Sequence, residues 1–238
     1  GKSTQAPKLL LYSLKAIDYK NDAKVACTQP RIPPTTQNAS RIAAEMGVPI
    51  LEYNKNMKDE VRSKNYYVQY KHQKNNHENH SQKGLVLKIM TDGTLEQELK
   101  NPVLKKLDTD KKNYTENNVY DIVIVDEAHE HNANMDLILT RMKYTTYYNN
   151  DIKLVIISAT MDEDEPVYRR FYREINDNRM YPLDLWLEEN KLDRINVDRR
   201  IHISPPGETT RFKIEEIYRP GVEQVEDIVV EILKTTND

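Results

Sequence analysis

Short apolar runs along the chain end abruptly in polar residues. The central run, Ile122–Val125, is followed at once by the carboxylates Asp126 and Glu127. A β-branched run bounded by polar residues predicts a strand that is buried on both faces, as in a parallel sheet. The same pattern occurs in three further stretches, residues 24–28, 84–90 and 152–157. All four stretches are therefore predicted to be buried strands of one sheet.

Apolar residues at helical spacing mark the segments between these strands. A helix near the N-terminus is predicted from three leucines, Leu9, Leu10 and Leu14. Pro33 and Pro34 suit the first turn of a second helix, which runs to Met46 and ends at Gly47. Further helices are predicted from Leu95 and Leu99, from Met135, Ile138, Leu139 and Met142, and over residues 161–173. Alternating strands and helices predict an α/β fold with a doubly wound, mostly parallel sheet.

Two polar segments interrupt this pattern, residues 52–83 and residues 176–200. Residues 52–83 contain a predicted strand at residues 66–70, and residues 71–83 are predicted to be a solvated loop. The three histidines of that loop lack the Cys or carboxylate neighbours that a metal site would need. Beyond residue 176, short strands are predicted over residues 201–204 and 211–218, and Pro220-Gly221 is a predicted domain boundary.

Composition limits the partners of the chain. None of the apolar runs approaches the roughly 18 residues of a membrane span, so no membrane partner is expected. The net charge of −3 gives no global attraction to nucleic acid, and any such binding must use a local basic patch. The single Cys27 cannot form an internal disulfide, which fits an intracellular, reducing compartment, the cytoplasm or the nucleus. The chain has no initiating Met or signal peptide, so it is expected to be a piece of a longer protein.

Four predicted strand ends bring polar residues to one edge of the sheet, at residues 28–31, 91–93, 126–129 and 158–160. Open α/β sheets bind ligands at this carboxyl edge. A buried strand that delivers Asp126 and Glu127 there is how P-loop NTPases hold Mg²⁺ and activate a water. Gly1-Lys2-Ser3-Thr4 has the form of the end of a phosphate-binding loop. In such a loop, Lys2 pairs with the β- and γ-phosphates of ATP, and Ser3 joins Asp126 as a ligand of Mg²⁺.

Local reasoning leaves alternatives open at the other strand ends. Arg31 is either positioned to meet a phosphate or an ordinary solvated arginine, and Arg41 is more often a surface residue. Thr91 or Asp92 can cap the following helix, which needs no ligand. Alternatively, the Thr91 hydroxyl and the backbone amides near it bind a phosphate of nucleic acid.

Taken together, these motifs resemble the DEAH/RHA family of superfamily 2 helicases, which includes poxviral RNA helicases. The resemblance covers residues 1 to about 165 and rests on six stretches in the family's order: Gly1-Lys2-Ser3-Thr4-Gln5-Ala6-Pro7, Thr28-Gln29-Pro30-Arg31, Arg41-Ile42-Ala43-Ala44-Glu45-Met46-Gly47, Met90-Thr91-Asp92-Gly93, Asp126-Glu127-Ala128-His129-Glu130 and Ser158-Ala159-Thr160. It implies an RNA-translocating, NTP-hydrolysing motor. Residues 1–219 would form its first RecA-like domain, truncated at both ends, and residues 220–238 would begin a second RecA-like domain in cis.

The resemblance also implies roles for single residues. Glu127 would orient and deprotonate the attacking water. Gly1 to Thr4 would bind the phosphates of ATP or another NTP, with Ser3 and Asp126 holding Mg²⁺. His129, Ser158 and Thr160 would couple the nucleotide state to RNA binding, and Arg41 would stack on the nucleotide base. Arg31, Thr91, Asp92 and Gly93 would contact the RNA backbone.

The sequence departs from the family pattern at two places. The phosphate loop lacks its first part, and Ile32 replaces the second arginine expected after Arg31. The isolated 238 residues are therefore expected to hydrolyse ATP barely or not at all. Three alternatives stay open: a P-loop kinase or transferase with Glu127 as base, a nucleic-acid-binding domain without catalysis, and a motor that acts on DNA.

Overall fold

A computed structural model of the protein describes residues 1–17, 21–50, 67–77, 84–100, 119–148, 152–176 and 200–203, together with Val230 and Lys234. The chain divides into two compact units, Gly1–His202 and Ile203–Asp238. The elements below all belong to the first unit. The boundary predicted at residues 219–220 and the strand predicted at residues 211–218 fall outside the described residues, so they stay predictions.

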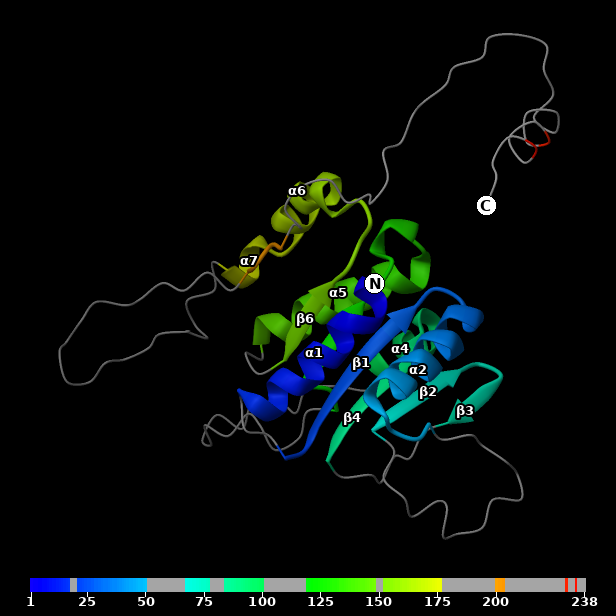
Figure 1. The fold of residues 1–238 in the computed structure, drawn as a ribbon. Helices are drawn as coiled ribbons and strands as arrows, with labels where there is room; N and C mark the ends of the chain where they lie inside the picture. Colours follow the sequence, from blue (N-terminus) through cyan, green and yellow to red (C-terminus); the bar gives the residue numbers. More distant parts are fainter. Residues whose placement is uncertain are drawn as a thin grey trace, which may run out of the picture. The chain divides into compact units, whose positions relative to one another are not determined.

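Six strands of the described chain form one sheet, in the order β3-β2-β4-β1-β5-β6 (Figure 1). Their bounds are β1 Ala23–Gln29, β2 Val68–His72, β3 Asn75–His77, β4 Leu85–Thr91, β5 Ile122–Val125 and β6 Lys153–Ile156. All neighbouring pairs are parallel except β2 with β3. Cys27 of β1 lies opposite Ile89 of β4 and Ile124 of β5. The prediction of an α/β fold with a mostly parallel sheet is therefore confirmed.

Three local predictions are wrong. Residues 71–77 are not a loop, because β2 extends to His72 and β3 pairs with it in an antiparallel hairpin. Strand β6 is only partly buried, because it is the outermost of the described strands on its side. Residues 201–203 do not form a strand. In each place the pairing of the backbone with a neighbouring strand, rather than the local apolar pattern, determines whether a strand forms and how deeply it is buried.

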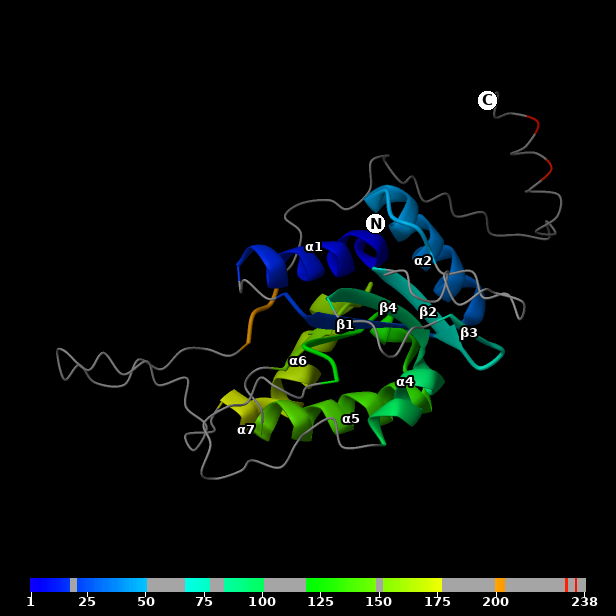
Figure 2. The same ribbon diagram turned by 90° about the horizontal axis from the view of Figure 1, so that it is seen from below.

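Helices cover both faces of the sheet (Figure 2). Helices α1 (Lys2–Ala16) and α2 (Ile32–Met46) lie on one face, while α4 (Asp92–Leu99) and α5 (Ala133–Tyr148) lie on the other. The remaining helical segments are η1 (Ala128–Glu130), α6 (Met161–Phe171) and α7 (Arg173–Asn176). Each helix that follows a parallel strand begins at the carboxyl edge of the sheet, so its N-terminal amides point toward that edge.

The two faces have separate apolar cores. The first core joins residues of α1 and α2 to the sheet, among them Leu11, Leu14, Ala39 and Ile42. The second joins residues of α4 and α5 to the sheet, among them Leu95, Met135, Ile138 and Met142. The predicted helical spacing of α4 and α5 is thus confirmed. In α1 the prediction is partly wrong, because Leu9 is 64% exposed and the buried stripe consists of Thr4, Pro7, Leu11 and Leu14.

The ends of α2 follow its sequence. Arg31 is extended before the helix, and a proline occupies the first turn, where its missing N–H is not needed. Gly47 closes the helix with φ of 65° in the left-handed region, which glycine adopts without a steric penalty. The predicted bounds of this helix are therefore confirmed.

Leu14 and Leu9 of α1 offer a matched test of the fold. Leu14→Ala is expected to lower the free energy of unfolding by about 2–5 kcal/mol, because it opens a cavity in a packed core. Leu9→Ala makes the same chemical change on the solvent side and should alter it by no more than about 0.5 kcal/mol. Urea unfolding of both variants measures the difference. Equal effects of the two substitutions would contradict the placement of α1 on the sheet.

Candidate functional site

The polar ends of β1, β4, β5 and β6 meet at one edge of the sheet, as predicted. Backbone pairing continues beyond β5 and β6, since the amide of Ile157 donates to the Val125 carbonyl and the amide of Ala128 donates to the Ile157 carbonyl, each at 2.9 Å. These two bonds place the segment Asp126–His129 beside the segment Ser158–Thr160. Two sequence motifs separated by about 30 residues thus form one site.

Asp126 lies at the centre of this edge and is fully buried. Its Oδ2 accepts a hydrogen bond of 2.6 Å from Nε2 of Gln29, the last residue of β1. Its Oδ1 accepts one of 3.0 Å from the amide of Glu127. Because a carboxylate oxygen has two acceptor positions, each oxygen keeps one for a ligand.

Glu127 turns the chain out of β5 with φ of 55°, in the left-handed region. A residue other than glycine pays about 1–3 kcal/mol for this conformation, and such strain gathers at functional sites. The turn leaves the Glu127 side chain 38% exposed, next to the buried Asp126. The two carboxylates therefore differ in environment: one is held inside the protein, and the other faces solvent.

His129 links the two motifs. Its Nε2 lies 3.5 Å from Oε2 of Glu127, and its Nδ1 accepts a hydrogen bond of 3.3 Å from the amide of Ala159. One imidazole ring thus contacts the carboxylate at the end of β5 and the backbone after β6. A shift of the segment Asp126–His129 would therefore change the contacts of the segment Ser158–Thr160 through this ring, and the reverse also holds.

The hydroxyls of Ser158 and Thr160 share a partner on α6. Both donate to Oδ2 of Asp164, Ser158 at 3.2 Å and Thr160 at 2.9 Å. His131 approaches the other oxygen of the same carboxylate at 3.9 Å. Asp164 therefore holds the segment Ser158–Thr160 against α6. It also lies close to His131, at the end of η1.

Lys2 reaches this site from the first turn of α1. Its Nζ donates a hydrogen bond of 2.9 Å to the carbonyl of Ser158. Thr4 is buried, and its hydroxyl donates to the carbonyl of Gly1, which holds the start of the helix together. The structure thus brings the predicted phosphate-binding residues Gly1, Lys2, Ser3 and Thr4 to the same edge as Asp126.

Ser3 and Asp126 have the donor chemistry of a Mg²⁺ site. Mg²⁺ prefers oxygen ligands and is usually held by one or two protein groups, substrate phosphates and waters. Ser3 is half-buried, and each oxygen of Asp126 accepts one hydrogen bond and keeps a second acceptor position. Within the described ranges, no group of three or more His, Cys, Asp or Glu is arranged to hold a metal alone, and Mg²⁺ needs none. The residues present therefore fit Mg²⁺.

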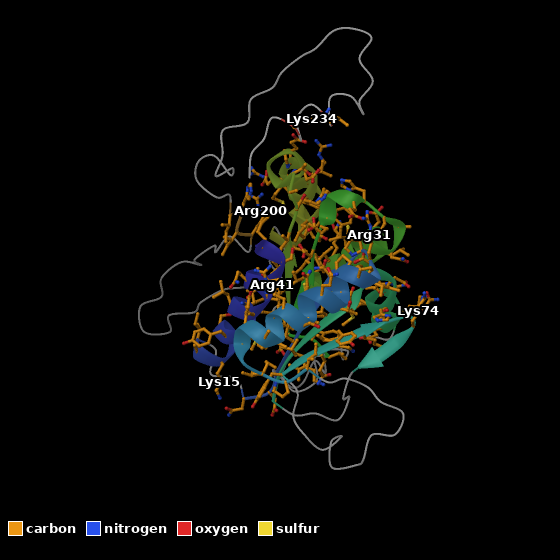
Figure 3. The ribbon with its side chains drawn as sticks, turned by 45° about the vertical axis from the view of Figure 1, so that its right-hand side comes forward. Lys15, Arg31, Arg41, Lys74, Arg200 and Lys234 are labelled. Carbon is orange, nitrogen blue, oxygen red and sulfur yellow. The ribbon has the colours of Figure 1, made fainter. Side chains whose placement is uncertain are left out.

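Arg31 stands at the start of α2 on this edge (Figure 3). Its side chain is 71% exposed, and its Nη2 lies 3.3 Å from the carboxylate of Glu130. An exposed ion pair of this kind contributes only about 0–1 kcal/mol. A phosphate group can therefore replace Glu130 as the partner of Arg31 at little cost.

Thr91, Asp92 and Gly93 form the turn from β4 into α4. The Thr91 hydroxyl lies 2.8 Å from that of Thr94, so Thr91 begins the helix without a side-chain cap bond to the backbone. Asp92 is only 1% exposed, and burial raises the pKa of its carboxyl, an effect that a hydrogen bond from Asn132 partly offsets. The Asp92 side chain thus points into the protein, whereas Thr91 and Gly93 are half-buried.

Arg41 lies on the exposed side of α2 (Figure 3), one turn before Glu45. Its Nε donates a hydrogen bond of 2.8 Å to Glu45. Glu45 also accepts hydrogen bonds from Gln5 and Lys8 of α1. The Arg31 and Arg41 side chains therefore project from different parts of α2, and Arg41 belongs to a polar seam between α1 and α2.

Three residues of the site were not predicted from the sequence: Gln29, Asn132 and Asp164. Gln29 is the last residue of a predicted strand, so its position at the edge was visible, but its contact with Asp126 was not. Asn132 precedes the apolar spacing of α5 at the point where a helix cap is favoured, and its Oδ1 does accept from the amide of Met135. Asp164 lies four residues after Thr160, the spacing of neighbours on a helix.

Cys27 takes no part in this chemistry. It is fully buried in β1, and burial raises the pKa of its thiol well above the ordinary value. A buried neutral thiol is a poor nucleophile, so Cys27 acts as a small core residue.

The fold and the site define a RecA-like α/β domain, in which helices enclose a mostly parallel sheet and the candidate nucleotide residues meet at its carboxyl edge. The chain is 55% identical, over 232 aligned residues that cover 92% of it, to a protein of Acanthamoeba polyphaga mimivirus named "Putative ATP-dependent RNA helicase". The chain spans only 13% of the length of that protein. No protein-family model matches the chain. The likeness confirms the resemblance to RNA helicases of large DNA viruses.

No helix in the described part of the chain is both long and apolar enough to span a lipid bilayer.

Proposed function

We propose that this chain is the first RecA-like domain of an ATP-dependent RNA helicase of the DEAH/RHA family, in which hydrolysis of an NTP drives translocation on RNA and unwinding. The observation that carries the proposal is the contact of His129 with both Glu127 and Ala159. It joins the segment suited to hydrolysis to the segment Ser158–Thr160. The likeness to the mimivirus protein over 92% of the chain supports the same function.

In this proposal, the nucleotide binds between the start of α1 and the end of β5. Lys2 pairs with the β- and γ-phosphates, and the first turn of α1 adds backbone amides. Glu127 orients the attacking water and takes its proton. Mg²⁺, held by Ser3 and Asp126, would neutralise charge on the phosphates. Arg41 stacks on the base of ATP or another NTP.

RNA binds through its backbone at the other end of the site. Arg31, Thr91 and Gly93 contact phosphates, which carry no sequence information and so let a motor step along any RNA. Because the net charge of the chain is −3, this contact depends on local groups and should weaken with salt. A second RecA-like domain in cis completes the motor in this proposal, and the protein works inside the cell.

ATP hydrolysis by the complete polypeptide that carries this chain tests the proposal. The rate is measured with RNA, with DNA and without nucleic acid, in wild type and in the Glu127→Gln variant. We expect stimulation by RNA in wild type and, in the variant, hydrolysis slowed by about 10²–10⁴-fold. Stimulation by DNA alone would identify a DNA motor, and hydrolysis that depends on neither nucleic acid would favour a kinase or transferase. Binding of RNA without any hydrolysis would identify a silent nucleic-acid-binding domain.

A further inference from the structure

Two helices on the same face of the sheet begin next to each other at its carboxyl edge. Helix α4 starts at Asp92, directly after Thr91, and α5 starts at Ala133, shortly after the segment Asp126–His131. The side chain of Asn132 bonds to both helices. Its Nδ2 donates to Oδ2 of Asp92 at 2.7 Å, and its Oδ1 accepts from the amide of Met135 at 2.9 Å.

Both partners of Asn132 are buried. Met135 is fully buried in the core, and Asp92 is 1% exposed. Oδ1 of Asp92 is buried without a well-formed hydrogen bond among the described residues, although the nearby Thr28 hydroxyl lowers the pKa of this carboxyl, and the Asn132 amide donates to the other oxygen. A buried carboxylate that loses its donor is strongly disfavoured, which makes this bond sensitive to any movement of α4 relative to α5.

The backbone that leads from Glu127 to Asn132 restrains Asn132 as well. Glu127 and His131, at the two ends of η1, both adopt left-handed backbone conformations, with φ of 55° and 44°. This short turn leaves little freedom between Glu127 and Asn132. Gly93 also lies close to the first turn of α5, because a Cβ added at Gly93 would lie 3.3 Å from Nδ2 of Asn134.

A helix cap alone does not explain this residue. Serine or aspartate would accept the bond from Met135 as well as asparagine does. Asparagine additionally has the Nδ2 donor, and this group donates its hydrogen bond to Asp92. The side chain is therefore suited to connecting the two helix starts, beyond capping one of them.

We propose that Asn132 is a positioning residue that couples nucleic-acid contact at Thr91 and Gly93 to hydrolysis at Glu127. In this role Asp92 acts through Asn132, inside the protein, and does not itself touch nucleic acid. RNA that binds at the turn into α4 shifts the Asp92 carboxylate, and Asn132 passes the shift to the turn that carries Glu127. This inference rests on the proposed function and names a step within it.

The Asn132→Ser variant tests the coupling, because serine keeps a capping oxygen but is too short to reach Asp92. ATP hydrolysis by the complete polypeptide is measured with and without RNA, at a temperature where circular dichroism shows every variant folded. We expect the basal rate and the KM for ATP to stay at wild-type values, while stimulation by RNA falls by about five-fold or more, the range of a typical coupling between sites. Asn21→Ser, the same change at an exposed position before β1, should leave stimulation unchanged.

Two Asp92 variants add a rescue test. Asp92→Asn keeps an acceptor for the Asn132 amide and should retain stimulation by RNA, whereas Asp92→Ala should lose it. Wild-type stimulation in Asn132→Ser would overturn the inference. So would equal losses of basal and stimulated rates, since these indicate a structural defect. An absence of RNA stimulation in wild type would instead overturn the proposed function, so the two failures are distinguishable.

Discussion

Glu127→Gln is expected to slow ATP hydrolysis by about 10²–10⁴-fold, the usual contribution of a general base, while ATP still binds. Glutamine keeps the size of the side chain but cannot take a proton from water. The strained turn at φ of 55° and the exposed position beside buried Asp126 both place this carboxylate where a water can reach it. Steady-state hydrolysis and equilibrium binding of a fluorescent ATP analogue separate the two effects.

Glu163→Gln provides the matched control. Glu163 lies on the exposed side of α6, so the same loss of one negative charge should leave hydrolysis at the wild-type rate. If both variants lost activity equally, a general effect of charge would explain the result. Full activity in Glu127→Gln would remove Glu127 from the hydrolytic role and favour a different base at this edge.

Much of the fold could be predicted because burial on both faces of a parallel strand demands a continuous apolar run. This demand makes β1, β4 and β5 visible in the sequence. The convergence of Asp126 with the segment Ser158–Thr160 follows from the same logic, since parallel strands end at one edge. Gly47 and the prolines of α2 were predictable because their backbone requirements are local.

Other features depend on strand order and edges, which no local pattern contains. Gln29 bonds to Asp126 only because β1 lies beside β5 in the sheet. The polar strand β3 forms through its backbone pairing with β2, so its side chains give no apolar signal. Leu9 and Leu14 both fit a helical stripe in the sequence, and only the position of the sheet decides that Leu14 is buried and Leu9 exposed.

The candidate site also contains residues that could be predicted from the sequence and residues that could not. The residues that contribute charge or hydroxyl groups, such as Lys2 and Glu127, stand in recognisable motifs. Asn132 and Asp164 instead bond to Asp92, 40 residues away, and to Thr160, one helical turn away, and they stand in no motif of their own. Their contacts identify how one strand end can influence another, which the motifs alone do not show.

Lys2→Met is expected to lower kcat/KM for ATP by about 10²–10⁴-fold. The proposed role gives Lys2 charged hydrogen bonds to two phosphates, each worth about 1.5–3 kcal/mol, and about 1.4 kcal/mol corresponds to a tenfold change. Methionine keeps an unbranched side chain of similar length without the charge. Lys15→Met, at the far end of the same helix, should retain wild-type kinetics (Figure 3).

The bond between Nζ of Lys2 and the Ser158 carbonyl gives this prediction a second measurable part. Pairing of Lys2 with phosphates would release the carbonyl, and the hydroxyl of the same serine is already bonded to Asp164 of α6. Nucleotide binding in wild type should therefore change amide hydrogen exchange around Ser158–Thr160 and at the start of α6. In Lys2→Met this change should disappear even at saturating nucleotide. A wild-type exchange response in the variant would show that the segment Ser158–Thr160 senses the nucleotide by another route, through Glu127 and His129.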